Sequence, residues 1–241
     1  MGADVGTDWQ AAARSALAWW EAAGVDMVVD ELPRDWLTPP AAPAPATASP
    51  APAPAAASLP PTLVEFLAWR LSDAAPEAPW GGARLPFSPM GASGLLVLTD
   101  VPEDEDARTG TLMSGPAGRL LDNMLAAIGL CRDDAMLASL AIARPATGRI
   151  AGTALPELAG LARHLITLAQ PRALLLLGQD PSCALTGIDA ARAKGSLHLV
   201  NHAGGTVAAA VMLHPRWLLG RPAAKADAWA DLQMLRGDAL S

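Results

Sequence analysis

Short aliphatic runs alternate with amphipathic segments over residues 95–235. The aliphatic runs are near-continuous, as is typical of strands buried on both faces, and lie at 95–99, 136–142, 173–177 and 207–213. The segments between and after them predict helices at 116–128, 156–169, 181–187 and 222–235. Each helix has a proline at or near its first turn, where a missing N–H costs nothing. The pattern predicts an α/β fold, a three-layer α/β/α sandwich with a central, mainly parallel four-stranded sheet.

The first quarter of the chain has a different pattern. Residues 8–23 predict an amphipathic helix whose apolar face includes Leu17 and Trp20. Residues 38–61 are almost only alanine, proline, serine and threonine, which bury too little apolar area to offset their ordering entropy and favour an extended spacer. We therefore expect an N-terminal helical element at 1–37, an Ala/Pro-rich linker at 38–61 and one folded domain at 62–241. The sequence does not identify a protein partner for the N-terminal element.

Two smaller elements complete the expected fold. Residues 63–71 predict a short helix at the start of the domain. Residues 201–205, Asn-His-Ala-Gly-Gly, predict a hairpin turn that joins a short strand to the last aliphatic run.

Composition and charge narrow the classes of function. The chain is 51% hydrophobic, which is ample for a core, but its net charge is −7 and its pI is near 5.0. A dedicated duplex-DNA binder usually carries a basic surplus for phosphate contacts, so any DNA contact here must come from a local patch. Cys131 and Cys183 lie far apart and outside any Cys-x-x-Cys pair, which argues against a disulfide framework or a thiolate zinc site.

The chain also lacks the usual signals of export or membrane insertion. Its N-terminus has no basic region, and no apolar run approaches the roughly 20 residues of a membrane span. We therefore expect a cytoplasmic protein with two buried free thiols and no membrane partner.

Candidate chemistry is concentrated in two motifs, each directly after an aliphatic run. The first is Asp100-Val101-Pro102, an acidic run at 103–106, Arg108-Thr109-Gly110, and Gly115-Pro116-Ala117-Gly118 followed by Leu120-Leu121-Asp122. The second is His214-Pro215-Arg216-Trp217-Leu218-Leu219. Parallel strands deliver such loops to one edge of a sheet, where α/β proteins build their sites.

Together the two motifs resemble the uracil-DNA glycosylase superfamily, in particular its iron–sulfur branch, the family 4 and family 5 type. The resemblance needs no gap between Asp100 and Leu125, and it extends more weakly over about residues 94–235. It implies a hydrolase that cleaves the N-glycosidic bond of uracil in single- or double-stranded DNA, as in base-excision repair. Asp100 would orient the attacking water, and His214 would stabilise negative charge on the leaving uracil oxygen.

The same resemblance assigns the binding residues. Those expected to contact the substrate base are Pro102, Gly110, Met113 and Ser139, and those expected to contact DNA are Gly115, Gly118, Pro215 and Arg216. Three positions depart from the family pattern: Met113 replaces a stacking phenylalanine, Ser139 an asparagine that reads the base, and Glu103 a glycine. Arg216, Arg221 and Lys225 form the expected basic patch for phosphates.

The cysteine ligands of the family's iron–sulfur cluster are missing. Two would be expected within residues 66–90, which contain no cysteine, and the other two fall on Ala143 and Leu158. We therefore expect no cofactor and no metal.

Several alternatives remain open at this stage. The departures favour a catalytically degenerate module that binds DNA or a protein partner. An unrelated nucleotide- or small-molecule-binding α/β protein remains if the motif match is accidental. His198 and His202 have the i,i+4 spacing of some metal ligands. The acidic run at 103–106 could bind a cation, although most runs of charge form solvated faces.

Overall fold

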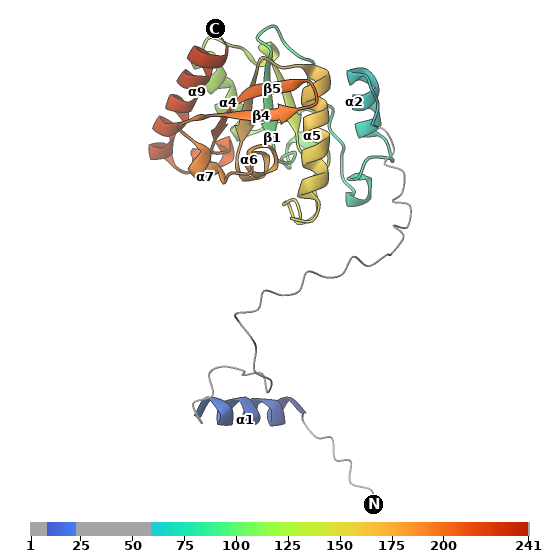
Figure 1. The fold of residues 1–241 in the computed structure, drawn as a ribbon, viewed down its shortest axis with the longest axis vertical. Coiled ribbons are helices and arrows are strands. Elements are labelled where there is room, and N and C mark those ends of the chain that lie inside the picture. The colour runs from blue at the N-terminus through green and yellow to red at the C-terminus, as the bar shows by residue number, and fades with distance from the viewer. Residues whose placement is uncertain (1–8, 23–58, 241) are drawn as a thin grey trace, which may run out of the picture. The chain divides into compact units, whose positions relative to one another are not determined.

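The computed structural model describes residues 9–22 and 59–240 (Figure 1). The chain divides into two units, Met1–Ala56 and Ala57–Ser241. In the first unit the expected helix is present as α1 (Trp9–Ala22), with Leu17 and Trp20 both exposed. Most of the predicted linker, 38–61, and the rest of the predicted N-terminal element lie outside the described residues.

The second unit is built on a five-stranded sheet of order β2-β1-β3-β5-β4. Four strands are parallel: β1 (Leu95–Thr99), β2 (Ala135–Ser139), β3 (Ala173–Leu177) and β5 (Gly205–Met212). In register, Val97 lies opposite Leu137 on one side and Leu175 on the other. The fifth strand, β4 (Leu197–His202), pairs antiparallel with β5 through the expected hairpin. The predicted mainly parallel sheet is confirmed. The four strands that were predicted are the parallel ones, and the antiparallel β4 makes a fifth.

Helices cover both faces of the sheet (Figure 1). Leu96 and Leu98 of β1 face a core built with α2 (Leu63–Leu71), α5 (Leu155–Ala169), α6 (Gln179–Thr186) and α7 (Ala190–Ala193). Leu95 and Val97 face a second core built with α4 (Pro116–Ala127), α8 (Pro215–Leu219) and α9 (Lys225–Ala239). Alternate side chains of one strand thus enter opposite cores, which confirms the three-layer architecture.

The remaining short elements lie in connections. They are α3 (Asp106–Thr109) and the 3₁₀ turns η1 (Ala78–Trp80), η2 (Arg132–Asp134) and η3 (Pro222–Ala224). Among the described residues, no helix is long and apolar enough to cross a membrane.

One boundary differs clearly from the sequence pattern. The second aliphatic run was expected as a strand to residue 142, but β2 ends at Ser139. Leu140, Ala141 and Ile142 are buried although they are not in a strand, and the Leu140 and Ala141 amides donate to the Thr99 and Asp100 carbonyls. A run of apolar residues indicates that the residues are buried, but not that they form a strand. Here the buried run continues beyond β2 into the loop that follows it.

A buried ion pair fixes the segment after α2 to that loop. The guanidinium of Arg70 lies 2.6 Å from the Glu77 carboxylate, and both side chains are almost fully excluded from solvent. Arg70 also donates to the Leu140 carbonyl at 2.8 Å, and Glu77 accepts from the Ile142 amide at 3.2 Å. The pair therefore satisfies backbone groups of the β2 loop that would otherwise be buried without partners.

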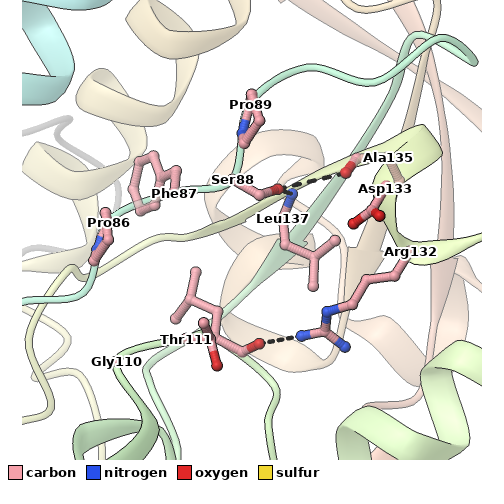
Figure 2. Close-up of a pocket in the computed structure, with 11 residues that line it drawn as sticks. Pro86, Phe87, Ser88, Pro89, Gly110, Thr111, Arg132, Asp133, Ala135 and Leu137 are labelled. Atoms are coloured by element: carbon pink, nitrogen blue, oxygen red, sulfur yellow. Dashed lines mark hydrogen bonds between the residues drawn. The ribbon is translucent and has the colours of Figure 1, made fainter.

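The outer edge of β2 is closed by an extended segment. The Ser88 amide donates to the Leu137 carbonyl, while the Ser88 hydroxyl accepts from the Leu137 amide and donates to the Ala135 carbonyl (Figure 2). Leu85 likewise donates to the Ile142 carbonyl at 3.1 Å. Residues 85–88 thus take the place that another strand would occupy.

Candidate active site

Asp100 lies immediately after β1, at the carboxyl edge of the sheet. Its Oδ1 accepts the Val101 amide at 2.7 Å and the Thr99 hydroxyl at 3.3 Å. Its Oδ2 accepts from the guanidinium of Arg216. Because its side chain is only 13% exposed, these partners fix the orientation of the carboxylate.

His214 reaches the same edge from β5. It is almost fully buried, and its Nδ1 accepts the Arg216 amide at 3.1 Å, which caps α8. Since Nδ1 is an acceptor, the proton of the neutral ring is on Nε2, which lies 2.8 Å from the Thr99 hydroxyl and donates to it. Thr99 in turn donates to Asp100, so the two candidate catalytic residues are joined through one hydroxyl.

The imidazole of His214 is held neutral. Burial and, to a smaller extent, the nearby Arg216 lower the pKa of His214 to about 4, while Asp100 and Asp106 oppose this change. Nε2 lies 3.8 Å from Asp100 Oδ1 and 3.9 Å from Glu103 Oε1. At neutral pH this side chain can therefore donate one hydrogen bond but carries no charge of its own.

Arg216 ties the two motifs together. Its guanidinium forms ion pairs with Asp100 and, at 2.7 Å, with Glu103. Asp100 and Glu103 raise the pKa of Arg216 against the opposing effect of burial. Arg216 was expected to contact DNA phosphates, and in this structure its donors are directed to carboxylates of the site instead.

These side chains border a cavity of ≈ 430 Å³. Its walls come from the segments that follow all four parallel strands: Asp100 after β1, Arg149 after β2, Asp180 after β3 and His214 after β5. The cavity thus lies where the carboxyl ends of the strands converge, as expected for an α/β site. The predicted meeting of Asp100 and His214 at one edge is what the structure shows.

A buried carboxylate organises the loop between β1 and α4. Asp106 accepts hydrogen bonds from the Glu103, Met113 and Ser114 amides and from the Ser114 hydroxyl. It is 1% exposed. The sequence interpretation treated the run at 103–106 as a solvated face, which is wrong for Asp106.

Two of the four residues expected to contact the base, Met113 and Ser139, do not line this cavity. Met113 is buried in the core on the α4 side of the sheet and has a φ of +56°, held by the Asp106 carboxylate. Ser139 is the last residue of β2, and its buried hydroxyl has no hydrogen-bond partner among the described residues. Neither side chain therefore borders the cavity that Asp100 and His214 share, although Ser139 lies opposite Thr99 in the sheet.

The other expected binding residues are distributed around the site. Pro102 is buried and its carbonyl accepts from Arg144 at 2.9 Å, while Pro215 begins α8 directly after His214. Gly115 immediately precedes α4 and Gly118 lies in its first turn, where a Cβ would overlap the Met113 carbonyl oxygen. Glycine at 118 is thus explained by close backbone packing.

Gly110 lies at a second cavity, of ≈ 390 Å³, beside the β2 edge (Figure 2). Phe87 and Leu137 supply apolar walls, and Arg132 reaches across to the Leu112 carbonyl. This cavity shares no lining residue with the Asp100 and His214 cavity. Gly110 therefore does not face the candidate catalytic pair.

The basic residues also differ from the sequence expectation. Arg221 lies over the exposed ring of Trp217 at 4.9 Å, and Lys225 is exposed at the start of α9. Arg149, which the sequence interpretation did not single out, is exposed and lines the candidate cavity. The sequence signal that could have found it is its position seven residues after the end of the second aliphatic run, 136–142.

The residues at the family's cluster positions do not fit an iron–sulfur group. Ala143 and Leu158 are buried and have no ligating atom. The segment 66–90, where two further cysteines would be expected, contains the buried Arg70–Glu77 ion pair instead. Within residues 9–22 and 59–240, no group of three or more histidine, cysteine or acidic side chains is placed to hold a metal. Cys131 and Cys183 are free thiols as expected, but the expectation that both are buried is wrong, since Cys131 is exposed and Cys183 is half-buried.

Comparison with known proteins agrees with this architecture. No curated protein matches the sequence. A family model, that of the uracil DNA glycosylase superfamily, matches residues 86–233, which is more than half of the chain and includes both motifs. With the parallel sheet and the Asp100 and His214 edge already described, this protein belongs to the uracil DNA glycosylase superfamily.

Proposed function

We propose that this protein hydrolyses the N-glycosidic bond of uracil in DNA. The observation that carries the proposal is the convergence of Asp100 and His214 at one cavity at the carboxyl edge of the sheet. Membership of a superfamily that acts on DNA supports it. An enzyme of this kind extrudes the target nucleotide from the stack and binds it in a pocket before cleaving the bond.

The two side chains have complementary roles in this reaction. Asp100, held by Val101 and Arg216, orients a water molecule toward the sugar. The neutral His214 donates a hydrogen bond from its Nε2–H to a uracil oxygen as negative charge develops there. This bond replaces the one that Nε2 makes to the Thr99 hydroxyl. No metal or cofactor is assigned to any step of the proposal.

DNA would be held by the exposed basic side chains near the cavity. Arg149 lines it, and Arg221 and Lys225 lie just beyond α8. Since the net charge of the chain is −7, this local patch must supply the attraction to phosphates.

Uracil release from single- and double-stranded oligonucleotides tests the proposal directly. His214→Ala should reduce the rate by about 10²–10³, the usual effect of removing one donor to developing charge. His198→Ala is the matched control, because His198 lies on β4 and bonds to the Ala193 carbonyl and Ser196. Equal rates for the two variants, or no release by the wild type above a buffer control, would reject the proposal.

A second candidate rests on the ion pairs of Arg216. The guanidinium engages both Asp100 and Glu103, and Met113 and Ser139 do not line the cavity. We propose as the alternative a glycosylase-fold module that binds DNA or a protein partner without cutting. Fluorescence anisotropy with labelled oligonucleotides separates the candidates: binding without uracil release supports the module.

A further inference from the structure

Asp180 contributes a carboxylate to the candidate cavity that the sequence motifs do not include. It is the second residue of α6, directly after β3, and it lines the cavity together with Asp100 and His214. The three acidic residues that line this cavity differ in their partners. Asp100 and Glu103 form ion pairs with Arg216, whereas Asp180 has no hydrogen bond or ion pair within the part of the chain that the structure describes.

The start of α6 does not account for this residue. The helix begins after Gly178, with no side-chain cap, and the Asp180 carboxylate accepts no amide of the helix. Gln179 is engaged elsewhere, because its Oε1 accepts the Ala190 amide at 3.2 Å. Asp180 is therefore a half-buried acid that performs no capping or bridging role within the described residues.

The surroundings of Asp180 raise the pKa of its carboxyl group above the ordinary aspartate value. Burial is the main cause that raises the pKa of Asp180, and the Asp100 carboxylate raises it further, while Arg216 and Arg149 oppose both. The other titratable groups at the cavity are Glu103, Arg144 and the neutral His214. A carboxylate with such a raised pKa in a cleft is suited to take up a proton during a reaction.

We propose that Asp180 is the general base of the reaction, receiving a proton from the water that Asp100 orients. This rests on the proposed glycosylase function. In the step, the water oxygen bonds to C1′ of the deoxyribose as the C1′–N1 bond breaks. The electron pair of that bond leaves with uracil, the water proton passes to the Asp180 carboxylate, and the uracil anion later takes a proton from solvent. The products are uracil and an abasic deoxyribose.

Asp180→Asn tests the role, with Asp133→Asn as the matched control. Asp133 is an exposed residue at the second cavity. We expect Asp180→Asn to lower the rate of uracil release by about 10²–10⁴, the range for loss of a general base, and Asp133→Asn to leave it unchanged. In the wild type, kcat/KM should fall with decreasing pH at a pH above the ordinary aspartate value of about 4. This acid limb should be absent from the residual activity of Asp180→Asn.

Stability distinguishes catalysis from a structural role. A carboxyl whose pKa is raised by folding contributes stability at low pH that is lost as the pH rises through its folded pKa. Asp180→Asn should therefore melt at the same temperature as the wild type, or higher, at pH 7.5. If Asp180→Asn loses activity only because it has lost stability, the assignment is overturned. In that case Asp180→Glu, which keeps a carboxylate, should also fail to recover the rate of uracil release.

The outcomes separate this inference from the function on which it rests. If the wild type releases uracil and Asp180→Asn does so at a similar rate with its acid limb intact, Asp180 is not the base and the glycosylase proposal stands. If the wild type releases none, both proposals are rejected together.

Discussion

Replacing Glu77 by glutamine would remove one charge of the buried Arg70–Glu77 pair while nearly preserving its shape. The guanidinium of Arg70 would then remain in a site where it is 1% exposed, with the Leu140 carbonyl still accepting its bond at 2.8 Å but without its paired carboxylate. Burial lowers the pKa of Arg70 and Glu77 opposes that effect, so the carboxylate offsets the cost of burying the cation. Breaking a buried pair by removing one partner costs about 3–5 kcal/mol.

The measurement is thermal and urea unfolding of the full chain. For a unit of this size, 1 kcal/mol shifts the melting temperature by about 2–4 °C, so Glu77→Gln should lower it by about 6–20 °C. The double variant Arg70→Met with Glu77→Leu removes both charges and should be less destabilised than the sum of the two single variants. A loss below about 1 kcal/mol for Glu77→Gln, or additive single effects, would refute this account of the pair.

Further predictions concern His214 and two helical glycines. Because burial lowers the pKa of His214 to about 4, the folded state binds a proton at this ring less readily than the unfolded state does. The free energy of unfolding should therefore fall by about 3 kcal/mol as the pH drops from 6.5 to 4. Urea unfolding of His214→Gln should show less of this loss. Gly118→Ala forces a Cβ against the Met113 carbonyl and should destabilise by about 1–3 kcal/mol in the same assay, whereas Gly160→Ala, within α5 and with no atom near its Cβ, should stabilise by about 1 kcal/mol. A Gly118→Ala variant as stable as the wild type would show that the turn at Met113 moves freely.

The layered fold could be predicted because its signal is local. Five-residue aliphatic runs such as 95–99 and 173–177 bury every residue, and the strands begin and end at the predicted positions. The meeting of Asp100 and His214 also follows from sequence, since both come directly after parallel strands. Chain direction and strand order bring such residues together whatever their side chains are.

The partners of charged residues could not be predicted in this way. Asp106 and Glu77 are buried, yet Asp106 lies in an acidic run and Glu77 in a stretch of alanine and proline, and neither pattern predicts a buried carboxylate. The donors to Asp106 are amides of its own loop, such as those of Met113 and Ser114, whereas Glu77 accepts from the Ile142 amide, which is distant in the chain. Arg216 likewise meets Asp100 and Glu103 only because the first and last motifs converge. No periodicity records such a pairing.

Met113 shows a different limit of sequence reasoning. Its alignment with a stacking phenylalanine placed it at the base, but the backbone there turns with a φ of +56° and sends the side chain into the core beneath α4. The turn is held by the Asp106 carboxylate and by the close approach of Gly118. A motif can therefore match position by position while one of its side chains points elsewhere.

The two edges of the sheet differ in their capacity to recruit another strand. At β2 the backbone of Leu137 is already saturated, since both its amide and its carbonyl bind Ser88 (Figure 2). At the opposite edge, β4 pairs with β5 alone among the described strands, and Leu199 on it is 72% exposed. An uncovered edge strand with an exposed aliphatic side chain is a template for self-association. Aggregation of the folded protein, where it occurs, should therefore start at β4 and be reduced by a charged residue at position 199.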